Sequence, residues 1–314
     1  MSFSSDVKEE LTRQFSEARH CQLAEIAAFV NMCGRVSILE TGNYSLRIQT
    51  ENEGVARKCF TLLEKAFNIE AEITVKKSRY LKRSNIYLVD VKDNKEVIKI
   101  LQAVKLIDSD NQIDEHVSLV NNTIIQKDCC KRAFARGAFL SAGSISAPEK
   151  FYHLEIVCTV REKAERLQSI IKSLGLEAKV VARKKYFVVY IKEGAQIVDM
   201  LALIGANIAL MDLENVRILK EVRNNVNRKV NCETANINKT VSAAVKQIED
   251  IRYIEATKGF SDLAPGLQEI AQMRLEYPDA SLKELGEMLT PPVGKSGVNH
   301  RLRKLSNIAN ENER

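Results

Sequence analysis

The sequence predicts an α+β protein made of two similar repeats, each with an antiparallel sheet, followed by an all-α unit near the C-terminus. Two segments about 108 residues apart carry the same order of features, which indicates an internal repeat. Both contain an alternating Tyr-x-Leu-x-Ile stretch, the pattern of a strand with one buried face. The last 50 or so residues instead carry short helical patterns punctuated by Pro and Ser.

The composition is that of a globular protein with more than one domain. The 314 residues are 45% hydrophobic and 28% charged, with few Gly and Pro, which excludes a disordered chain. A formal net charge of +6 is compatible with a polyanionic partner but is too small to identify one.

Cysteine usage and hydropathy indicate the cellular compartment in which the protein is found. The seven cysteines include no C-x-x-C pair, so neither a disulfide framework nor a zinc knuckle is indicated, and reduced intracellular thiols are expected. No signal peptide and no apolar run of about 18 residues is present, so we expect no membrane partner. A cytoplasmic location follows.

The repeats account for most of the chain. After an N-terminal helix in residues 1–20, the first repeat covers about 21–110 and the second about 128–210, within a domain that ends near residue 222. Each repeat begins with an apolar helix that ends in glycine, at Gly34 and Gly143, and continues into a strand, at Tyr44–Ile48 and Tyr152–Ile156.

The remaining elements of the repeats also correspond. Each repeat reads helix, two strands, helix, two strands, helix. The later elements are expected at 55–67, 73–76, 85–92 and 97–107 in the first repeat, and at 164–174, 179–182, 186–192 and 197–203 in the second. Any two α+β segments look alike at this coarseness, but the shared Tyr-x-Leu-x-Ile and Glu-Ala landmarks favour a true repeat.

The first helix of each repeat is rich in alanine and glycine, which lets two helices pack closely. This pattern resembles the LAGLIDADG homing-endonuclease fold, which implies a pseudo-twofold helix pair and saddle-shaped antiparallel sheets that lie on DNA. In active members of that family, the residue before the terminal glycine is a metal-binding Asp or Glu. The matching residues are Cys33 and Ala142, neither of which supplies the hard oxygen that Mg²⁺ prefers. We therefore expect no cleavage chemistry, no catalytic residue and no metal.

Basic segments lie between paired strands of each repeat. They contain Lys76, Lys77, Arg79, Lys82 and Arg83 in the first repeat and Arg183, Lys184 and Lys185 in the second. Contact with DNA phosphates and an ordinary solvated hairpin are equally good interpretations of these charges.

A basic, Asn-rich linker and helix are predicted over residues 223–260. Apolar periodicity weakens around Arg228 and Lys229, which suits a linker or a polar strip that faces DNA. A helix is expected to resume at about Thr240 and to end near Gly259.

Three short helices are predicted in residues 261–310. Pro265 opens the first and Pro278 closes it, Ser281 starts a capping box for the second, and Ser296 is expected to cap the third. The apolar positions of these helices fall on one side of each, as in a trihelical helix-turn-helix domain.

The third helix carries the candidate DNA-binding residues. We assign Asn299, His300 and Arg303 to base edges in the major groove, because Arg pairs with guanine and Asn with adenine. Phosphate contacts are assigned to the helix start and flanks, at Lys295, Ser296, Arg301 and Lys304. A small helical bundle with a solvated basic face is the alternative, and the six-residue turn before this helix is longer than usual.

Two motifs that suggest other chemistry are rejected. Gly294-Lys295-Ser296 resembles the end of a phosphate loop, but it has neither the earlier glycine nor a preceding strand. His20-Cys21 has no third group to orient a thiol nucleophile, so structural roles are expected for both residues. No cofactor is predicted.

The order of a carboxylate-free repeat pair, a basic Asn-rich segment and a helix that begins Gly294-Lys-Ser-Gly-Val-Asn-His-Arg-Leu302 resembles the WhiA family over nearly the whole chain. The resemblance implies a bacterial, nucleoid-associated regulator of transcription that binds double-stranded DNA and acts in cell division, chromosome segregation or sporulation. Other transcription factors and RNA polymerase are further partners to consider. Two alternatives stay open: an active homing endonuclease that takes its carboxylates from elsewhere, and a scaffold that binds only proteins.

Overall fold

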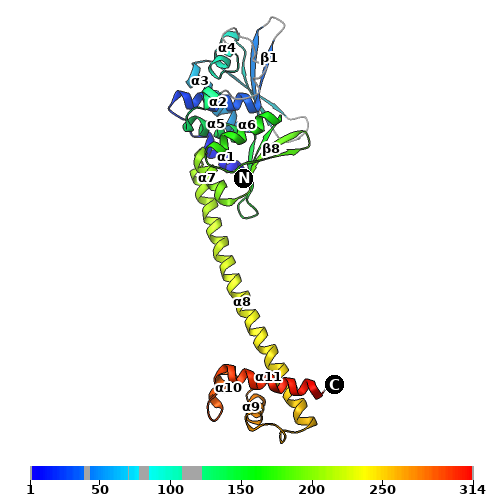
Figure 1. Cartoon of the computed structure of the whole chain (residues 1–314). Helices are drawn as coiled ribbons and strands as arrows, with labels where there is room; N and C mark the ends of the chain where they lie inside the picture. The colour runs from blue at the N-terminus through cyan, green and yellow to red at the C-terminus, as the bar shows by residue number, and fades with distance from the viewer. Residues whose placement is uncertain (1, 39–42, 70, 78–84, 108–121, 313–314) are drawn as a thin grey trace. The chain divides into compact units, whose positions relative to one another are not determined.

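The computed structural model describes residues 2–38, 43–69, 71–77, 85–107 and 122–312. The chain divides into two units, Met1–Lys220 and Glu221–Arg314. Figure 1 shows the order of helices and strands along the chain.

The predicted element order of the two repeats is confirmed. The first repeat consists of α2 (Arg19–Cys33), β1 (Gly34–Ile38), β2 (Tyr44–Thr50), α3 (Glu53–Phe67), β3 (Glu72–Lys77), β4 (Asn85–Val91) and α4 (Asn94–Ala103). After the short 3-10 helix η1 (Asn122–Ile125), the second consists of α5 (Asp128–Ala142), β5 (Gly143–Ile145), β6 (Leu154–Cys158), α6 (Arg161–Ser173), β7 (Lys179–Arg183), β8 (Tyr186–Ile191) and α7 (Gly194–Ile204).

The two sheets have the same topology. Their strand orders are β1-β2-β4-β3 and β5-β6-β8-β7, and all the pairs are antiparallel. The alternating residues Leu46 and Ile48 on β2, like Leu154 and Ile156 on β6, are buried in one core that both repeats share. Their neighbours along each strand lie on the opposite face, as the period-two pattern predicts.

Small residues bring α2 and α5 into close contact at the centre of this core. A Cβ atom added to Gly137 would lie 2.8 Å from Cβ of Ala28 and 2.9 Å from the carbonyl oxygen of Glu25, so only glycine fits this position without a shift. The predicted helix interface, with most of its alanines buried, is therefore confirmed.

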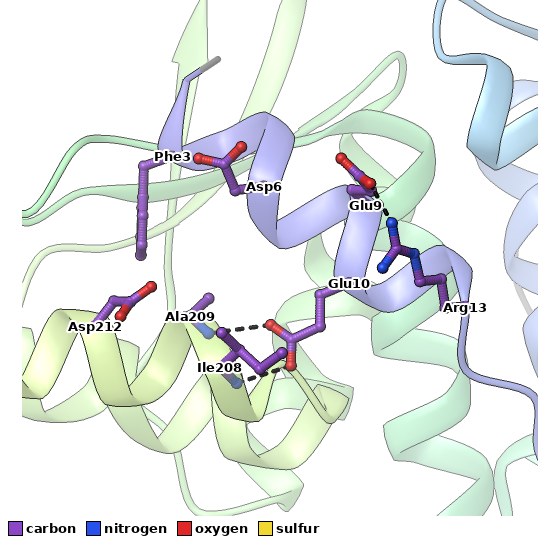
Figure 2. Close-up of a pocket in the computed structure, with 8 residues that line it drawn as sticks. All are labelled: Phe3, Asp6, Glu9, Glu10, Arg13, Ile208, Ala209 and Asp212. Atoms are coloured by element: carbon purple, nitrogen blue, oxygen red, sulfur yellow. Dashed lines mark hydrogen bonds and ion pairs between the residues drawn. The ribbon is translucent and has the colours of Figure 1, made fainter.

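An N-terminal helix, α1 (Phe3–Thr12), contacts the start of α8 (Asn207–Thr257) within the first unit. Figure 2 shows the Glu10 carboxylate accepting hydrogen bonds from the backbone N–H groups of Ile208, at 2.8 Å, and Ala209, at 3.0 Å. These N–H groups have no acceptor within α8, so Glu10 serves as the helix cap. The shallow cavity beside it, about 170 Å³, is lined by four acidic residues and is unsuited to a phosphate.

The prediction that a helix resumes only at Thr240 is wrong, because α8 is continuous for 51 residues through the Asn-rich segment. Apolar residues continue at spacings of four and seven in that segment, at Val222, Val226, Val230 and Ile237, although all four are exposed. Asparagine costs a helix only a fraction of a kcal/mol, about 0.7 at most, so it does not interrupt one. None of the described helices, α8 included, is apolar enough over a sufficient length to cross a membrane.

The second unit is the predicted set of three helices packed on the last turns of α8. These helices are α9 (Pro265–Glu276), α10 (Leu282–Met288) and α11 (Lys295–Asn312). Ile251 and Ile254 of α8 join their core, and the capping box at Ser281 is confirmed. The predicted cap at Ser296 is wrong: α11 begins at Lys295, so Ser296 lies within its first turn, and Val298 N–H donates to the Gly294 carbonyl at 3.1 Å. Glycine accommodates the cap position almost as well as serine does.

Candidate nucleic-acid interface

One face of α11 is buried and the opposite face is polar. Val298, Leu302 and Leu305 are at most 1% exposed and form part of the core of the second unit. Six polar side chains at helical spacing form what is called the exposed strip: Lys295, Ser296, Asn299, His300, Arg303 and Lys304. Asn299 is half-buried and the other five are exposed. All six are residues that the sequence analysis selected.

Arg301, the seventh selected residue, lies on the flank of α11 that packs against α9. Its guanidinium donates to the Gly266 carbonyl at 3.3 Å and lies 4.0 Å from a carboxylate oxygen of Glu269. Glu269 in turn accepts a 2.8 Å hydrogen bond from the backbone N–H of Thr290, in the turn before α11. These contacts give Arg301 a role in positioning the helix.

The long turn between α10 and α11 packs directly on α10 through Gly286. A Cβ atom at this position would lie 2.0 Å from the carbonyl oxygen of Val293, and Val293 N–H donates back to the Gly286 carbonyl at 2.9 Å. Close approach of two backbones therefore fixes the start of α11, although the turn has six residues. Arg274, buried in α9, secures the preceding turn by donating to the carbonyls of Pro278 and Ala280.

The first sheet presents basic residues on its uncovered face. Arg35 on β1 pairs in register with Arg47 on β2, and both line a depression of about 460 Å³ together with Lys76 of β3. Arg47 is held by Asp90 of β4 through a 2.6 Å ion pair, which offsets part of the positive charge. Of the segment predicted to contact phosphate, Lys76 and Lys77 are exposed strand residues, whereas Arg79, Lys82 and Arg83 lie outside the described residues.

The second sheet places its predicted basic residues at a hairpin tip. Arg183, Lys184 and Lys185 are exposed at the turn from β7 to β8, where Lys184 has a left-handed φ of 57°. Glu155 on β6 lies 3.7 Å from Arg183 and 3.0 Å from His153, so this face is less basic than that of the first sheet.

Arg228 and Lys229 are exposed on α8, in the second unit. Each is available to solvent as a phosphate contact requires, and neither has an ion pair among the described residues.

Cys33 and Ala142 occupy the last positions of α2 and α5. In the LAGLIDADG homing-endonuclease fold, which the sequence resembles, these helix ends carry the nuclease carboxylates. The Cys33 thiol donates to the Phe29 carbonyl at 3.3 Å, and burial raises its pKa to about 11. The charged groups that act on this thiol are the ammonium groups of Lys8 and Lys163. A neutral thiol, a methyl group and two cations do not form a site for a divalent cation.

A buried ionic cluster that the sequence analysis missed joins three helices of the first unit. Glu25 of α2 is 0% exposed and contacts Lys58 of α3 at 2.7 Å and Arg136 of α5 at 3.0 Å. Lys58 also donates to the Leu11 carbonyl at 2.8 Å. The signal in the sequence was a charged residue within the apolar run of each of the two central helices.

Comparison with known proteins covers both units. Three family models match: a WhiA N-terminal LAGLIDADG-like domain at residues 19–107, a WhiA LAGLIDADG-like domain at 131–223 and a WhiA C-terminal helix-turn-helix domain at 226–309. A relative from Lachnoclostridium phytofermentans is 56% identical over 98% of both chains, and one from Clostridium perfringens is 50% identical over 99% of this chain and 98% of its own. Both are named probable cell division protein WhiA.

Solved structures give the same fold. Full-length WhiA from Thermatoga maritima matches with a TM-score of 0.60 and 24% identity over 99% of both chains. The N-terminal LAGLIDADG domain of a WhiA protein matches with a TM-score of 0.51 and 21% identity, over 65% of this chain and 90% of its own. The family models, the relatives and the shared architecture lead to one conclusion: the chain belongs to the WhiA family.

Proposed function

We propose that this protein is a sequence-specific regulator of transcription that binds double-stranded DNA through α11 and has no nuclease activity. The exposed strip of α11 is the observation that carries the proposal. It places donor groups at helical spacing on the outward side of the last helix of a trihelical unit, which is the arrangement of a recognition helix.

The chemistry of the exposed strip fits the major groove. Asn299 and Arg303 are one helical turn apart, and their side chains match the hydrogen-bonding edges of adenine and guanine. His300 is a third candidate reader, while Lys295, Ser296 and Lys304 suit phosphates along the groove walls. Arg301 is left out of this assignment because Gly266 and Glu269 hold it.

The first unit supports a role in binding rather than in cleavage. Cys33 and Ala142 provide no carboxylate at the ends of the central helices, so the metal-assisted attack on a phosphodiester lacks its ligands there. Arg35, Arg47 and Lys76 on the uncovered face of the first sheet are the residues of this unit best placed to add phosphate contacts.

The names of the relatives support a role in cell division for the proposed regulation. Chromosome segregation and sporulation are the related processes that the family resemblance suggests. A regulator of this kind acts at the nucleoid, and contacts with other transcription factors or RNA polymerase would convert DNA binding into a change in transcription.

The test is selection of duplexes from a random pool by the full-length protein, followed by binding of the enriched and scrambled duplexes over a salt series. We expect one enriched motif whose affinity exceeds that of the scrambled duplex by at least about 10³. Enrichment of no motif would contradict sequence-specific binding. Absence of any salt-sensitive affinity would favour a scaffold that binds only proteins.

A further inference from the structure

Three thiols and one imidazole meet at the N-terminal ends of α2 and α5. Nδ1 of His20 lies 3.2 Å from Sγ of Cys130, 3.3 Å from Sγ of Cys21 and 4.0 Å from Sγ of Cys129. All four donor atoms lie within 4.8 Å of one another, and no described cysteine is in a disulfide. The four residues are called the thiol cluster below.

The thiol cluster follows the internal repeat. Cys129 comes 109 residues after His20, the same offset that separates Cys33 from Ala142 at the other ends of the two helices. Each repeat therefore contributes one residue pair from the same place in its first helix. The cluster lies between the two repeats, a full helix length from the degenerate nuclease positions.

The distances agree with a four-coordinate zinc ion. Zinc binds thiolate at about 2.3 Å and imidazole nitrogen at about 2.0 Å with tetrahedral geometry, which separates neighbouring donor atoms by roughly 3.5 to 3.8 Å. The observed separations of His20 from the three sulfurs bracket this range.

The charge and the accessibility of the cluster also suit such an ion. Zinc with three thiolates and a neutral imidazole carries one net negative charge, which the partial positive charge at two helix N-termini stabilises. Cys21 and Cys130 are buried, whereas His20 and Cys129 are exposed, so a metal can enter from solvent and still be shielded on its inner side.

We propose that His20, Cys21, Cys129 and Cys130 form a structural zinc site that joins the two repeats of the first unit. Four protein ligands of the Cys₃His type leave no open position, which is the mark of a structural rather than a catalytic zinc. The ion would hold the N-terminal ends of α2 and α5 together, opposite the ends that carry Cys33 and Ala142. This role does not depend on whether the protein binds DNA.

The experiment measures metal content and metal spectra on the full-length protein, purified with a reductant, incubated with zinc or cobalt(II) and desalted. We expect about one zinc per chain, and a cobalt(II) form with thiolate charge-transfer and tetrahedral d–d bands. Cys129→Ser removes an exposed ligand and should lose most of the bound metal, and Cys21→Ser with Cys130→Ser should lose all of it. The matched control is Cys232→Ser, an exposed thiol on α8 outside the cluster, which should load like the parent.

Thermal unfolding provides a second measurement. Zinc should raise the midpoint of the parent and of Cys232→Ser, but not that of Cys129→Ser. Three results would overturn the proposal: fewer than about one zinc in ten chains in the reduced parent, equal metal content in the parent and the folded Cys129→Ser variant, or a Cys21–Cys130 disulfide that persists in reductant with no bound metal. Circular dichroism of each variant confirms that it is folded.

Discussion

Glu25 is the residue on which the centre of the first unit depends most. Its fully buried carboxylate accepts contacts from Lys58 and Arg136, and both cations have further hydrogen bonds, to the Leu11 carbonyl and to the Ser16 hydroxyl among others. Burial lowers the pKa of Lys58, and the negative charge of Glu25 acts in the opposite direction. The three charges are therefore stable in the core only as a set.

Replacement of Glu25 tests whether the buried ionic cluster stabilises the first unit. Glu25→Gln should lower the free energy of unfolding by about 3–5 kcal/mol, because it leaves two buried cations without their anion. Urea denaturation of the full-length protein measures the loss. Glu165→Gln removes the exposed carboxylate that pairs with Arg161 and should leave the midpoint nearly unchanged. Equal effects of the two substitutions would show that the buried cluster is not a special feature of the fold.

The residues at the C-terminal ends of α2 and α5 predict that the protein does not cleave DNA. Purified protein should not nick or cut plasmid DNA with Mg²⁺ or Mn²⁺, because Cys33 and Ala142 supply no carboxylate and Lys8 and Lys163 place positive charge near Cys33. Agarose electrophoresis over long incubation is the measurement. Reproducible cutting that depends on Mg²⁺ or Mn²⁺ would contradict the assignment and favour the endonuclease alternative.

The exposure of a single residue could be predicted from sequence where its position on a helix decides it. The role of a residue could not be predicted where a contact with a residue distant in the sequence decides it. The polar positions of α11 follow from the spacing of Val298, Leu302 and Leu305. The guanidinium of Arg301 donates to the carbonyl of Gly266, 35 residues away, and no local sequence pattern reveals this contact. The thiol cluster was missed for the same reason, because its residue pairs are more than a hundred positions apart.

The turn between α10 and α11 holds the start of α11 in place through Gly286. Gly286→Ala would put a methyl group into the Val293 carbonyl, so we expect a loss of about 1–3 kcal/mol and faster amide exchange in α9 to α11. Hydrogen exchange with mass spectrometry on the full chain measures the effect for these helices. Lys283→Ala in α10 is the control, since its exposed side chain makes only a surface ion pair with Glu287. Unchanged protection in Gly286→Ala would contradict the packing role of the turn.

Element order was predictable wherever polar and apolar residues alternate with a clear period. β2 and β6 follow their Tyr-x-Leu-x-Ile stretches, and Ser281 with Glu284 starts α10 as its capping box requires. α8 was not predicted as one helix, because its apolar residues in the Asn-rich segment are exposed and interspersed with polar ones. Its length depends on backbone hydrogen bonding more than on a buried face.

Both units carry exposed basic residues, and we expect both to contribute to DNA binding. Residues 221–314, the second unit, should bind duplex DNA alone, but with lower affinity and a shallower salt dependence than the full chain. Each lost phosphate contact reduces the slope of log affinity against log salt by about 0.9, so the difference counts the contacts made by the first unit. Fluorescence anisotropy over a salt series measures both slopes. Equal slopes and affinities would exclude the first unit from the DNA interface.

Binding of single variants to the selected and scrambled duplexes tests whether α11 reads sequence. Asn299→Ala and Arg303→Ala should each weaken binding to the selected duplex by about 1–3 kcal/mol, relax the preference at one base pair and leave binding to the scrambled duplex nearly intact. Lys304→Ala should weaken both duplexes equally and flatten the salt dependence. If all three folded variants lose affinity for both duplexes in the same proportion, α11 does not read bases and the proposed sequence-specific binding through α11 is wrong.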